Sequence, residues 1–181
     1  MVPVRMDPNR RRWLVLGALL PLGLVARRVR AGADDDVAQG GGDIVPLRKD
    51  KTEWKRLLEP KRYRVLFEDW TEPPNSSPLN REKRDGSFLC AACYLPLFDS
   101  GDKFESGTGW PSFTRHIPGR IATERDFSWI WPRTEYHCIR CGGHQGHVFD
   151  DGPPPTGQRW CNNGLALVFV PRGEALPELR T

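Results

Sequence analysis

Residues 136–149 read Tyr-His-Cys-Ile-Arg-Cys-Gly-Gly-His-Gln-Gly-His-Val-Phe. Two strand-like runs, Tyr136–Ile139 and His147–Phe149, lie on either side of a glycine turn. The first run contains Cys138 and the segment between the runs contains Cys141, which together form a Cys-x-x-Cys pair. Turn residues also separate the other apolar runs, which are Ser87–Cys90, Ile121–Ala122 and Leu165–Val170. Short strands separated by turns favour antiparallel sheets. We therefore expect a mainly β fold in which Leu165–Val170 is a buried core strand.

The segment before these strands has a helical pattern. Apolar spacing predicts a short helix over Lys51–Pro60, with Thr52 as N-cap and Pro60 as the stop. Tyr63–Phe67 is predicted as a first strand or a turn, and Thr71–Asn80 as a long surface loop rich in Pro, Ser and Asn.

The formal net charge of +4 comes from the first 33 residues, which hold seven arginines and one acidic residue. Removing them from the totals of 27 basic and 23 acidic residues leaves 20 and 22, a net charge near −2. Nucleic-acid binding needs a basic face. The folded part of the chain is therefore not expected to bind nucleic acid.

Residues 1–33 have the pattern of an export signal. An arginine run precedes the apolar stretch Trp13–Ala26, and Ala31-Gly-Ala33 resembles a cleavage site. The stretch is shorter than the roughly 20 residues of a membrane span. Arginines followed by Trp13-Leu14 resemble a twin-arginine signal, which predicts a periplasmic or cell-envelope protein.

Two alternatives stay open, an uncleaved membrane anchor and a true start at Met6. After the signal, residues 34–50 include three consecutive glycines and are predicted to be a flexible linker. Residues 51–181 are predicted to be the domain that carries the function of the chain. No contact with a membrane is expected except through the signal.

Four of the five cysteines form two Cys-x-x-Cys pairs, Cys90/Cys93 and Cys138/Cys141. Two such pairs supply four thiolates, which is typical of a closed structural zinc site. Two disulfides are the main alternative for an exported protein. A mixed site of Cys138, Cys141, His144 and His147 is a second alternative, although the softer sulfur ligands should win and leave both histidines free.

Cys161 is the fifth cysteine, in Arg159-Trp-Cys-Asn-Asn163. A single cysteine is often an inert buried side chain. In an extended segment, however, Arg159, Cys161 and Asn163 would share one face. A neighbouring guanidinium favours the reactive thiolate. This grouping of a cation, a thiol and an amide predicts a nucleophile.

Four segments together resemble the methionine-R-sulfoxide reductases of the B type: Cys90–Cys93, Ser106–Phe113, His144–Pro153 and Thr156–Asn163. The resemblance extends from about Trp54 to Phe169. It implies two antiparallel sheets in a tent-like arrangement, with zinc tying loops together away from the active site.

The resemblance also implies roles for individual residues. Cys161 attacks the sulfoxide sulfur and is left as a sulfenic acid, while His147 and His144 protonate the departing oxygen. Asp151 orients His147. Sulfoxide and sulfenic acid are related sulfur oxidation states, so the enzyme cysteine is oxidised as the substrate is reduced, and the substrate oxygen leaves as water.

The remaining implied roles concern binding. Arg159 and Asn163 hold Cys161 or the bound sulfoxide. Trp110, in a stiff turn after Gly107-Thr-Gly109, packs against the terminal methyl of the R epimer. Phe149 is assigned to the substrate as well.

Many family members carry a resolving cysteine where this chain has Thr108. We therefore expect a one-cysteine enzyme whose sulfenic acid is reduced by an external thioredoxin-like or small thiol. Its expected substrates are oxidised proteins or peptides that contain methionine-R-sulfoxide. Its expected role is protein repair under oxidative stress. A second departure, Trp129-Ile-Trp131, either alters peptide specificity or fills core. The competing hypothesis is a non-catalytic, exported zinc-binding interaction module.

Overall fold

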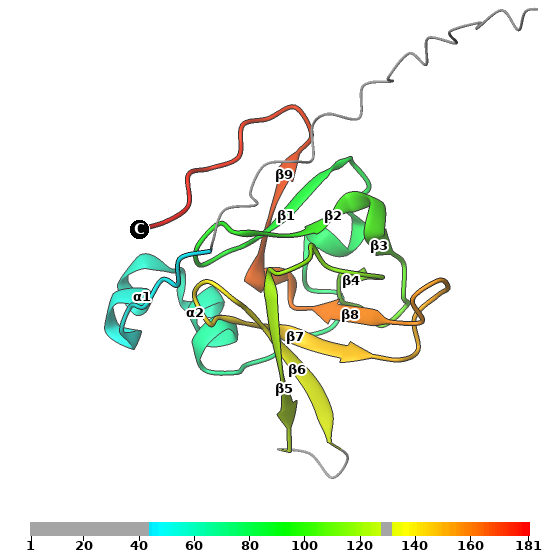
Figure 1. Cartoon of the computed structure of the whole chain (residues 1–181), viewed down its shortest axis with the longest axis horizontal. Coiled ribbons are helices and arrows are strands. Elements are labelled where there is room, and N and C mark those ends of the chain that lie inside the picture. The colour runs from blue at the N-terminus through cyan, green and yellow to red at the C-terminus, as the bar shows by residue number, and fades with distance from the viewer. Residues whose placement is uncertain (1–43, 128–131) are drawn as a thin grey trace, which may run out of the picture. The chain divides into compact units, whose positions relative to one another are not determined.

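The computed structural model of the chain describes residues 44–127 and 132–181 (Figure 1). The predicted export signal, residues 34–43 of the predicted linker and the Trp129–Trp131 segment lie outside these ranges. Within them, none of the helices is both long enough and apolar enough to cross a bilayer.

The described residues form two antiparallel sheets, as predicted (Figure 1). The smaller sheet has the order β2-β1-β9, and its strands are β1 Gly86–Cys90, β2 Pro96–Asp99 and β9 Leu167–Pro171. The larger sheet has the order β3-β4-β8-β7-β6-β5. Its strands are β3 Lys103–Phe104, β4 Ser112–Phe113, β5 Ile121–Asp126, β6 Arg133–Cys138, β7 His144–Phe149 and β8 Arg159–Asn162.

Helix α1 spans Lys51–Leu57 and begins with a capping box. The side chain of Asp50 accepts from the backbone N–H of Glu53, and the Glu53 carboxylate accepts from the N–H of Asp50. The N-cap is therefore Asp50 and not Thr52, because only at Asp50 can the two side chains satisfy these helix-end amides reciprocally.

Helix α2 spans Pro60–Phe67, so the prediction of a strand or turn over Tyr63–Phe67 was wrong. Pro60 begins this helix instead of only ending the first one, since proline fits the first helical turn. The helical spacing of four residues lets Tyr63 and Phe67 contact each other, with ring centroids 5.9 Å apart, and Phe67 stacks on Trp54 at 5.1 Å. This packing outweighs the local β-like composition.

Three short 3-10 helices complete the described part: η1 Pro78–Arg81, η2 Ser100–Asp102 and η3 Gly164–Ala166. The predicted core strand Leu165–Val170 therefore begins two residues late, at Leu167. It is also not buried throughout, since Val168 and Phe169 are only partly buried. β9 is an edge strand, and Val168 and Phe169 line a cavity of about 640 Å³.

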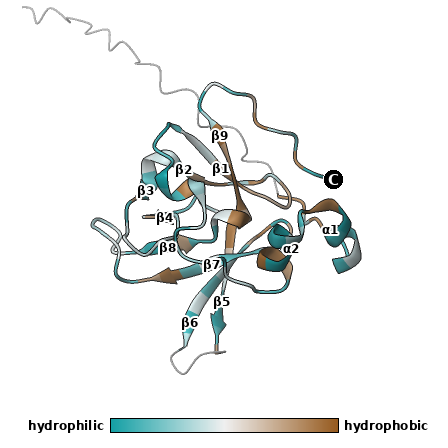
Figure 2. Ribbon diagram, turned by 180° about the vertical axis from the view of Figure 1, so that it is seen from behind, coloured by the Kyte–Doolittle hydropathy of each residue, from teal (hydrophilic) through white to brown (hydrophobic). Residues whose placement is uncertain are grey.

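Aromatic rings fill the core. Phe98 of β2 stacks on Phe113 of β4 with centroids 4.2 Å apart, and Phe88 of β1 contacts Phe113 at 4.9 Å. Tyr136 of β6 and Trp160 of β8 pack edge to face, with ring centroids 5.1 Å apart. Figure 2 shows the apolar colouring along β9, in contrast to the polar β5.

Part of the predicted linker contacts the domain. The backbone N–H of Leu47 donates to the carbonyl of Arg140 at 2.6 Å, and Ile44 and Leu47 pack against the core. The residues just before α1 are thus held by the turn that follows β6.

We expect Phe98→Ala to lower the free energy of unfolding by about 3–5 kcal/mol, because the ring is fully buried and its loss leaves a cavity. Urea denaturation measures this change. The matched control is Phe127→Ala, whose ring is 72% exposed, and its effect should stay within about 0.5 kcal/mol. Equal losses in both variants would contradict the core assignment.

Candidate active site

Strand pairing sets one row of side chains across the larger sheet. Cys161 of β8 lies opposite Ser112 of β4 on one side and opposite His147 of β7 on the other. The row continues through Glu135 of β6 to Glu124 of β5. Directly opposed residues share a face and have close Cβ atoms. The row therefore places Cys161, His147 and Glu135 next to one another, although they are distant in sequence.

The other face of the same strands carries the core. Tyr136 and Cys138 of β6 are fully buried, whereas Glu135 and His137 between them are only partly buried. In β8, Trp160 is buried in the aromatic core while Cys161 is partly exposed. Alternation along β6, and between Trp160 and Cys161 in β8, thus separates polar chemistry from packing.

The Cys161 thiol is protonated at neutral pH. Burial raises its pKa above the ordinary value, and this effect outweighs the opposing influence of Arg159 and of the Thr108 and Ser112 hydroxyls. Arg159 therefore acts in the predicted direction, but it does not by itself produce a thiolate. Ser106 Oγ lies 2.8 Å from both Thr108 Oγ1 and Ser112 Oγ, which ties the hydroxyls around the thiol into one network.

Asp151 pairs with Arg159 and not with His147, which corrects the expected contact. Arg159 Nε and Nη2 donate to the two carboxylate oxygens at 2.8 and 2.9 Å. This pairing lowers the pKa of Asp151. The guanidinium also lies 4.3 Å from the centre of the Phe149 ring. The reason is register: Phe149 is opposite Arg159, so the loop just after β7 reaches the start of β8.

The carboxylate beside His147 is that of Asp126, at the end of β5. His147 Nε2 lies 3.0 Å from Asp126 Oδ2, and Arg133 donates to the same oxygen at 2.7 Å. Burial lowers the pKa of His147, and Asp126 only partly offsets it. His147 is therefore a neutral imidazole at neutral pH, able to accept a proton.

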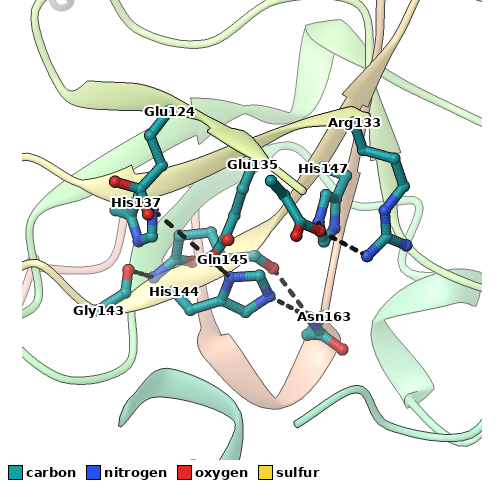
Figure 3. Close-up of polar contacts among 10 residues, drawn as sticks. Glu124, Arg133, Glu135, His137, Gly143, His144, Gln145, His147 and Asn163 are labelled. Carbon is teal, nitrogen blue, oxygen red and sulfur yellow. Dashed lines mark hydrogen bonds and ion pairs between the residues drawn. The ribbon is translucent and has the colours of Figure 1, made fainter. Parts of the chain in front are cut away.

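His144 is almost fully buried and is held on both sides of its ring. Its Nδ1 hydrogen-bonds to Glu135, and its Nε2 lies 3.5 Å from Asn163 Nδ2 (Figure 3). Burial raises the pKa of Glu135, but His144 and the two other nearby histidines lower it below its ordinary value. Asn163 also donates to the carbonyl of Gln145 at 3.2 Å, which fixes its amide.

A buried glutamate joins the Trp110 loop to the turn that carries Asn163. The indole Nε1 of Trp110 donates to the carbonyl of Glu72 at 3.0 Å, and the N–H of Glu72 donates to Asn163 Oδ1 at 3.1 Å. The Glu72 carboxylate accepts from the N–H groups of Gly164 and Leu165 at 2.6 and 3.1 Å. Glu72 therefore positions two site residues at once.

The turn before Trp110 depends on Gly109. Its φ is +95°, and a Cβ there would lie 2.7 Å from Pro74 Cβ. The Gly109 carbonyl accepts from Asn75 N–H at 2.7 Å and from Asn80 Nδ2 at 2.6 Å. The predicted surface loop thus braces the turn that presents Trp110.

Sequence reasoning did not assign roles to Glu72, Asp126 or Glu135. Alternation along β6 would have placed Glu135 on one face with Arg133 and His137, which is a usable signal. Glu72 and Asp126 have no comparable local pattern, because their partners come from other strands and loops.

The four remaining cysteines form one compact cluster that could hold a metal ion. Cys90 Sγ lies 3.6 Å from Cys141 Sγ, and Cys93 Sγ lies 3.5 Å from Cys138 Sγ, with all four sulfurs within 4.8 Å of one another. Tetrahedral zinc with Zn–S bonds of about 2.3 Å requires sulfurs about 3.8 Å apart. A disulfide requires about 2.05 Å. The geometry therefore fits a shared ion and not two disulfides.

The mixed cysteine–histidine site is not formed. His144 and His147 contact Glu135 and Asp126, whereas the thiol cluster consists of cysteines alone. Gln145 Nε2 lies 3.5 Å from Cys90 Sγ. From β7, therefore, it is the side chain of Gln145 that faces the cluster.

Known proteins resemble this chain over most of the described region. A model of the SelR domain matches residues 58–171. A peptide methionine sulfoxide reductase MsrB of Pseudomonas putida is 50% identical over 129 residues, 70% of this chain and 97% of that protein. The MsrB of Agrobacterium fabrum is 45% identical over 126 residues, 69% and 93% of the two chains. The MsrB of Methanosarcina barkeri is 48% identical over 124 residues, 68% and 87%.

Among solved structures, the chain resembles the Mis18 'Yippee-like' domain with a TM-score of 0.40 and 16% identity. That similarity covers 50% of this chain and 100% of the other. A similarity of this size says nothing about function.

Alkylation of Cys161 by iodoacetamide should increase with pH and reach its midpoint above that of an unperturbed thiol, because burial disfavours the thiolate. Arg159→Gln removes the stabilising cation and should slow alkylation at pH 7 by roughly threefold or more. Mass spectrometry measures the rate. Arg115→Gln, at an exposed pair with Asp102, is the matched control. An unchanged rate in Arg159→Gln would show that the guanidinium does not act on the thiol.

Proposed function

Because this chain belongs to the SelR-domain family of methionine sulfoxide reductases, we propose that it reduces protein-bound methionine-R-sulfoxide with Cys161 as the nucleophile. The family membership makes it an oxidoreductase acting on methionine-R-sulfoxide. The single observation that supports the mechanism best is the strand register that sets Cys161 directly opposite His147 and Ser112. The non-catalytic zinc module is not favoured, because it leaves this arrangement without a role.

The reaction starts from a neutral thiol and a neutral imidazole. Because burial holds Cys161 protonated, His147 accepts its proton as the thiolate sulfur attacks the sulfoxide sulfur. The imidazolium of His147 returns this proton to the sulfoxide oxygen, with Asp126 stabilising its charge. The hydrogen-bonded Glu135–His144 pair supplies the second proton, and the oxygen leaves as water.

A second water molecule then adds to the Cys161 sulfur as the bond to the substrate sulfur breaks, and the proton that this water releases returns to the Glu135–His144 pair. The products are methionine and Cys161 sulfenic acid, so the sulfoxide sulfur gains the two electrons that the cysteine sulfur loses. Two external thiols then reduce the sulfenic acid to the thiol, forming one disulfide and one water.

The substrate's methyl group packs against Trp110, whose indole is held by the Glu72 carbonyl. Phe149, covered by the Arg159 guanidinium, forms a second aromatic surface next to the start of β8. Asn163 is fixed by Glu72 and Gln145 and orients His144. A rigid indole beside a polar site can distinguish a methyl group from an S=O oxygen, which gives selection for the R epimer.

The reductant is external because the loop before Trp110 presents a hydroxyl, that of Thr108, to Cys161. Thr108 contacts the thiol but cannot form a disulfide with it. The other cysteines lie in the four-sulfur cluster. A thioredoxin-like protein or a small thiol completes the cycle, and export through the predicted signal would exclude the cytosolic thioredoxin.

The four-sulfur cluster binds zinc in a structural role. Four thiolates close the coordination shell, so the ion has no open position for substrate and serves to tie β1 and β6 together. Cys90 ends β1 and Cys138 ends β6, strands that belong to different sheets. The ion therefore links the two sheets.

The purified chain with excess dithiothreitol should reduce dabsylated methionine-R-sulfoxide and leave the S epimer unchanged, as measured by chromatography. Cys161→Ser should lose at least about a thousandfold in rate, since no nucleophile remains. The variant should keep its metal and its fold. Turnover of the S epimer, or activity in Cys161→Ser, would refute the proposed site.

Without a reductant, the same chain should release one methionine per molecule and gain a dimedone-reactive sulfenic acid without a new disulfide. Thr108→Cys provides the contrast, because a thiol at this position should trap Cys161 in a disulfide after one turnover. A disulfide in the unmodified chain would overturn the one-cysteine mechanism.

Elemental analysis should find one zinc ion per chain. Cys93→Ser should lose the ion and unfold at a markedly lower temperature, because metal binding in such sites contributes on the order of 10 kcal/mol. Cys161→Ser is the matched control and should keep both zinc and thermal stability. Full stability in a zinc-free Cys93→Ser variant would exclude a structural role for the ion.

A further inference from the structure

A second group of metal-ligating side chains lies on the polar face of β6 and β7. His137 is opposite His144 in the strand pairing, and Glu135 is two residues before His137 on the same strand. His137 Nε2 lies 3.6 Å from Glu135 Oε1, and His144 Nδ1 hydrogen-bonds to the same oxygen. One ligand atom from each of the three residues lies within 4.8 Å of the others (Figure 3).

We propose that Glu135, His137 and His144 form a second metal site that binds a divalent transition-metal ion and thereby inhibits the reductase. The inhibitory part rests on the proposed function, which assigns His144 to proton delivery. The binding part stands on the geometry alone.

The donor set selects the class of ion. Two imidazoles and one carboxylate suit zinc, nickel, copper, cobalt or ferrous iron and are poor ligands for magnesium or calcium. Ligand atoms at about 2.0–2.2 Å from such an ion are roughly 3–3.5 Å apart. The three side chains therefore need only small movements to coordinate, and the ion replaces the proton shared by His144 and Glu135.

The neighbouring triad of Asp126, Glu135 and His147 is the less favourable site. The Arg133 guanidinium donates to Asp126 at 2.7 Å, so a cation there would meet an existing positive charge. On the other side, Glu124 lies 3.1 Å from His137 Nε2 with its side chain 66% exposed. Glu124 can turn toward the ion and supply a fourth ligand.

The site is separate from the four-sulfur cluster, although His137 and Cys138 are adjacent in sequence. Consecutive residues of a strand point to opposite faces. Cys138 is fully buried with the other cysteines, whereas His137 lies on the polar face with its side chain 19% exposed. An ion can therefore reach His137 from solvent without displacing the structural zinc.

Metal binding here removes a group that the reaction uses. His144 Nδ1 would be bound to the ion, and the proton it shares with Glu135 would be lost. Its Nε2 would still face Asn163, so the ring need not leave its place. Inhibition should accordingly reverse when the ion is removed.

The binding test uses the full-length, zinc-loaded chain with Cys161→Ser, which removes the competing thiol. Calorimetric titration with Ni²⁺ should show one additional site per chain, and added Co²⁺ should give the absorption of a nitrogen–oxygen site without new thiolate charge-transfer bands. Adding His137→Gln should weaken Ni²⁺ binding at least tenfold. The matched control is His116→Gln, whose ring packs on Trp160 away from the triad.

The activity test uses the chain with Cys161 intact. Ni²⁺ should inhibit it reversibly, and His137→Gln should keep its basal rate while tolerating at least tenfold more Ni²⁺. Equal Ni²⁺ binding with and without His137 would overturn the site. Binding without inhibition would overturn the inhibitory role, whereas a chain inactive on both sulfoxide epimers would refute the proposed function and leave the binding result to decide the site.

Discussion

The pairing of β7 with β8 is the constraint on which the rest of the site depends. It sets His147 opposite Cys161 and Phe149 opposite Arg159. The close approach of the two strands requires Gly146, since a Cβ at that position would lie 2.0 Å from the Cys161 carbonyl oxygen. A slip by one residue would exchange the two faces of β8. Cys161 would then enter the aromatic core and Trp160 would occupy the polar face.

This pairing gives the larger sheet two distinct faces. The inner face holds Tyr136 and Trp160, whose rings pack against each other. Tyr136 also contacts Phe98 of the smaller sheet, which joins the two sheets. The outer face holds the thiol, the histidines and their carboxylates. The cysteine cluster forms where strand ends of both sheets meet. The rigid inner face therefore supports a polar site whose spacing is set by the backbone.

Carboxylates control the charge of that site. Each histidine of β7 contacts a different acid, His144 with Glu135 and His147 with Asp126. Burial disfavours the charged forms of the Cys161 thiol and the His147 imidazole, because it raises the pKa of the thiol and lowers the pKa of the imidazole. Dense packing of histidine and carboxylate groups also makes the outer face a ligand set for a cation. The same arrangement thus supplies both the proton-transfer groups of the proposed mechanism and the ligands of the proposed second metal site.

The sequence alone determined the mainly β fold, the family, the separation of four cysteines from Cys161 and the grouping of Arg159 with Cys161. The family follows from four motifs that resemble those of known members, whereas the other features depend on local spacing and alternation, which a linear chain displays directly. The sequence pattern misassigned Tyr63–Phe67 as a strand or turn, whereas the packing of Phe67 against Trp54 favours a helix. Only the tertiary structure decided that Asp126 pairs with His147, that Asp151 pairs with Arg159 and that Glu72 links Trp110 to Asn163. The physical reason is that these partners come from different strands and loops, and strand register and loop packing, not spacing along the chain, bring their side chains within hydrogen-bond distance.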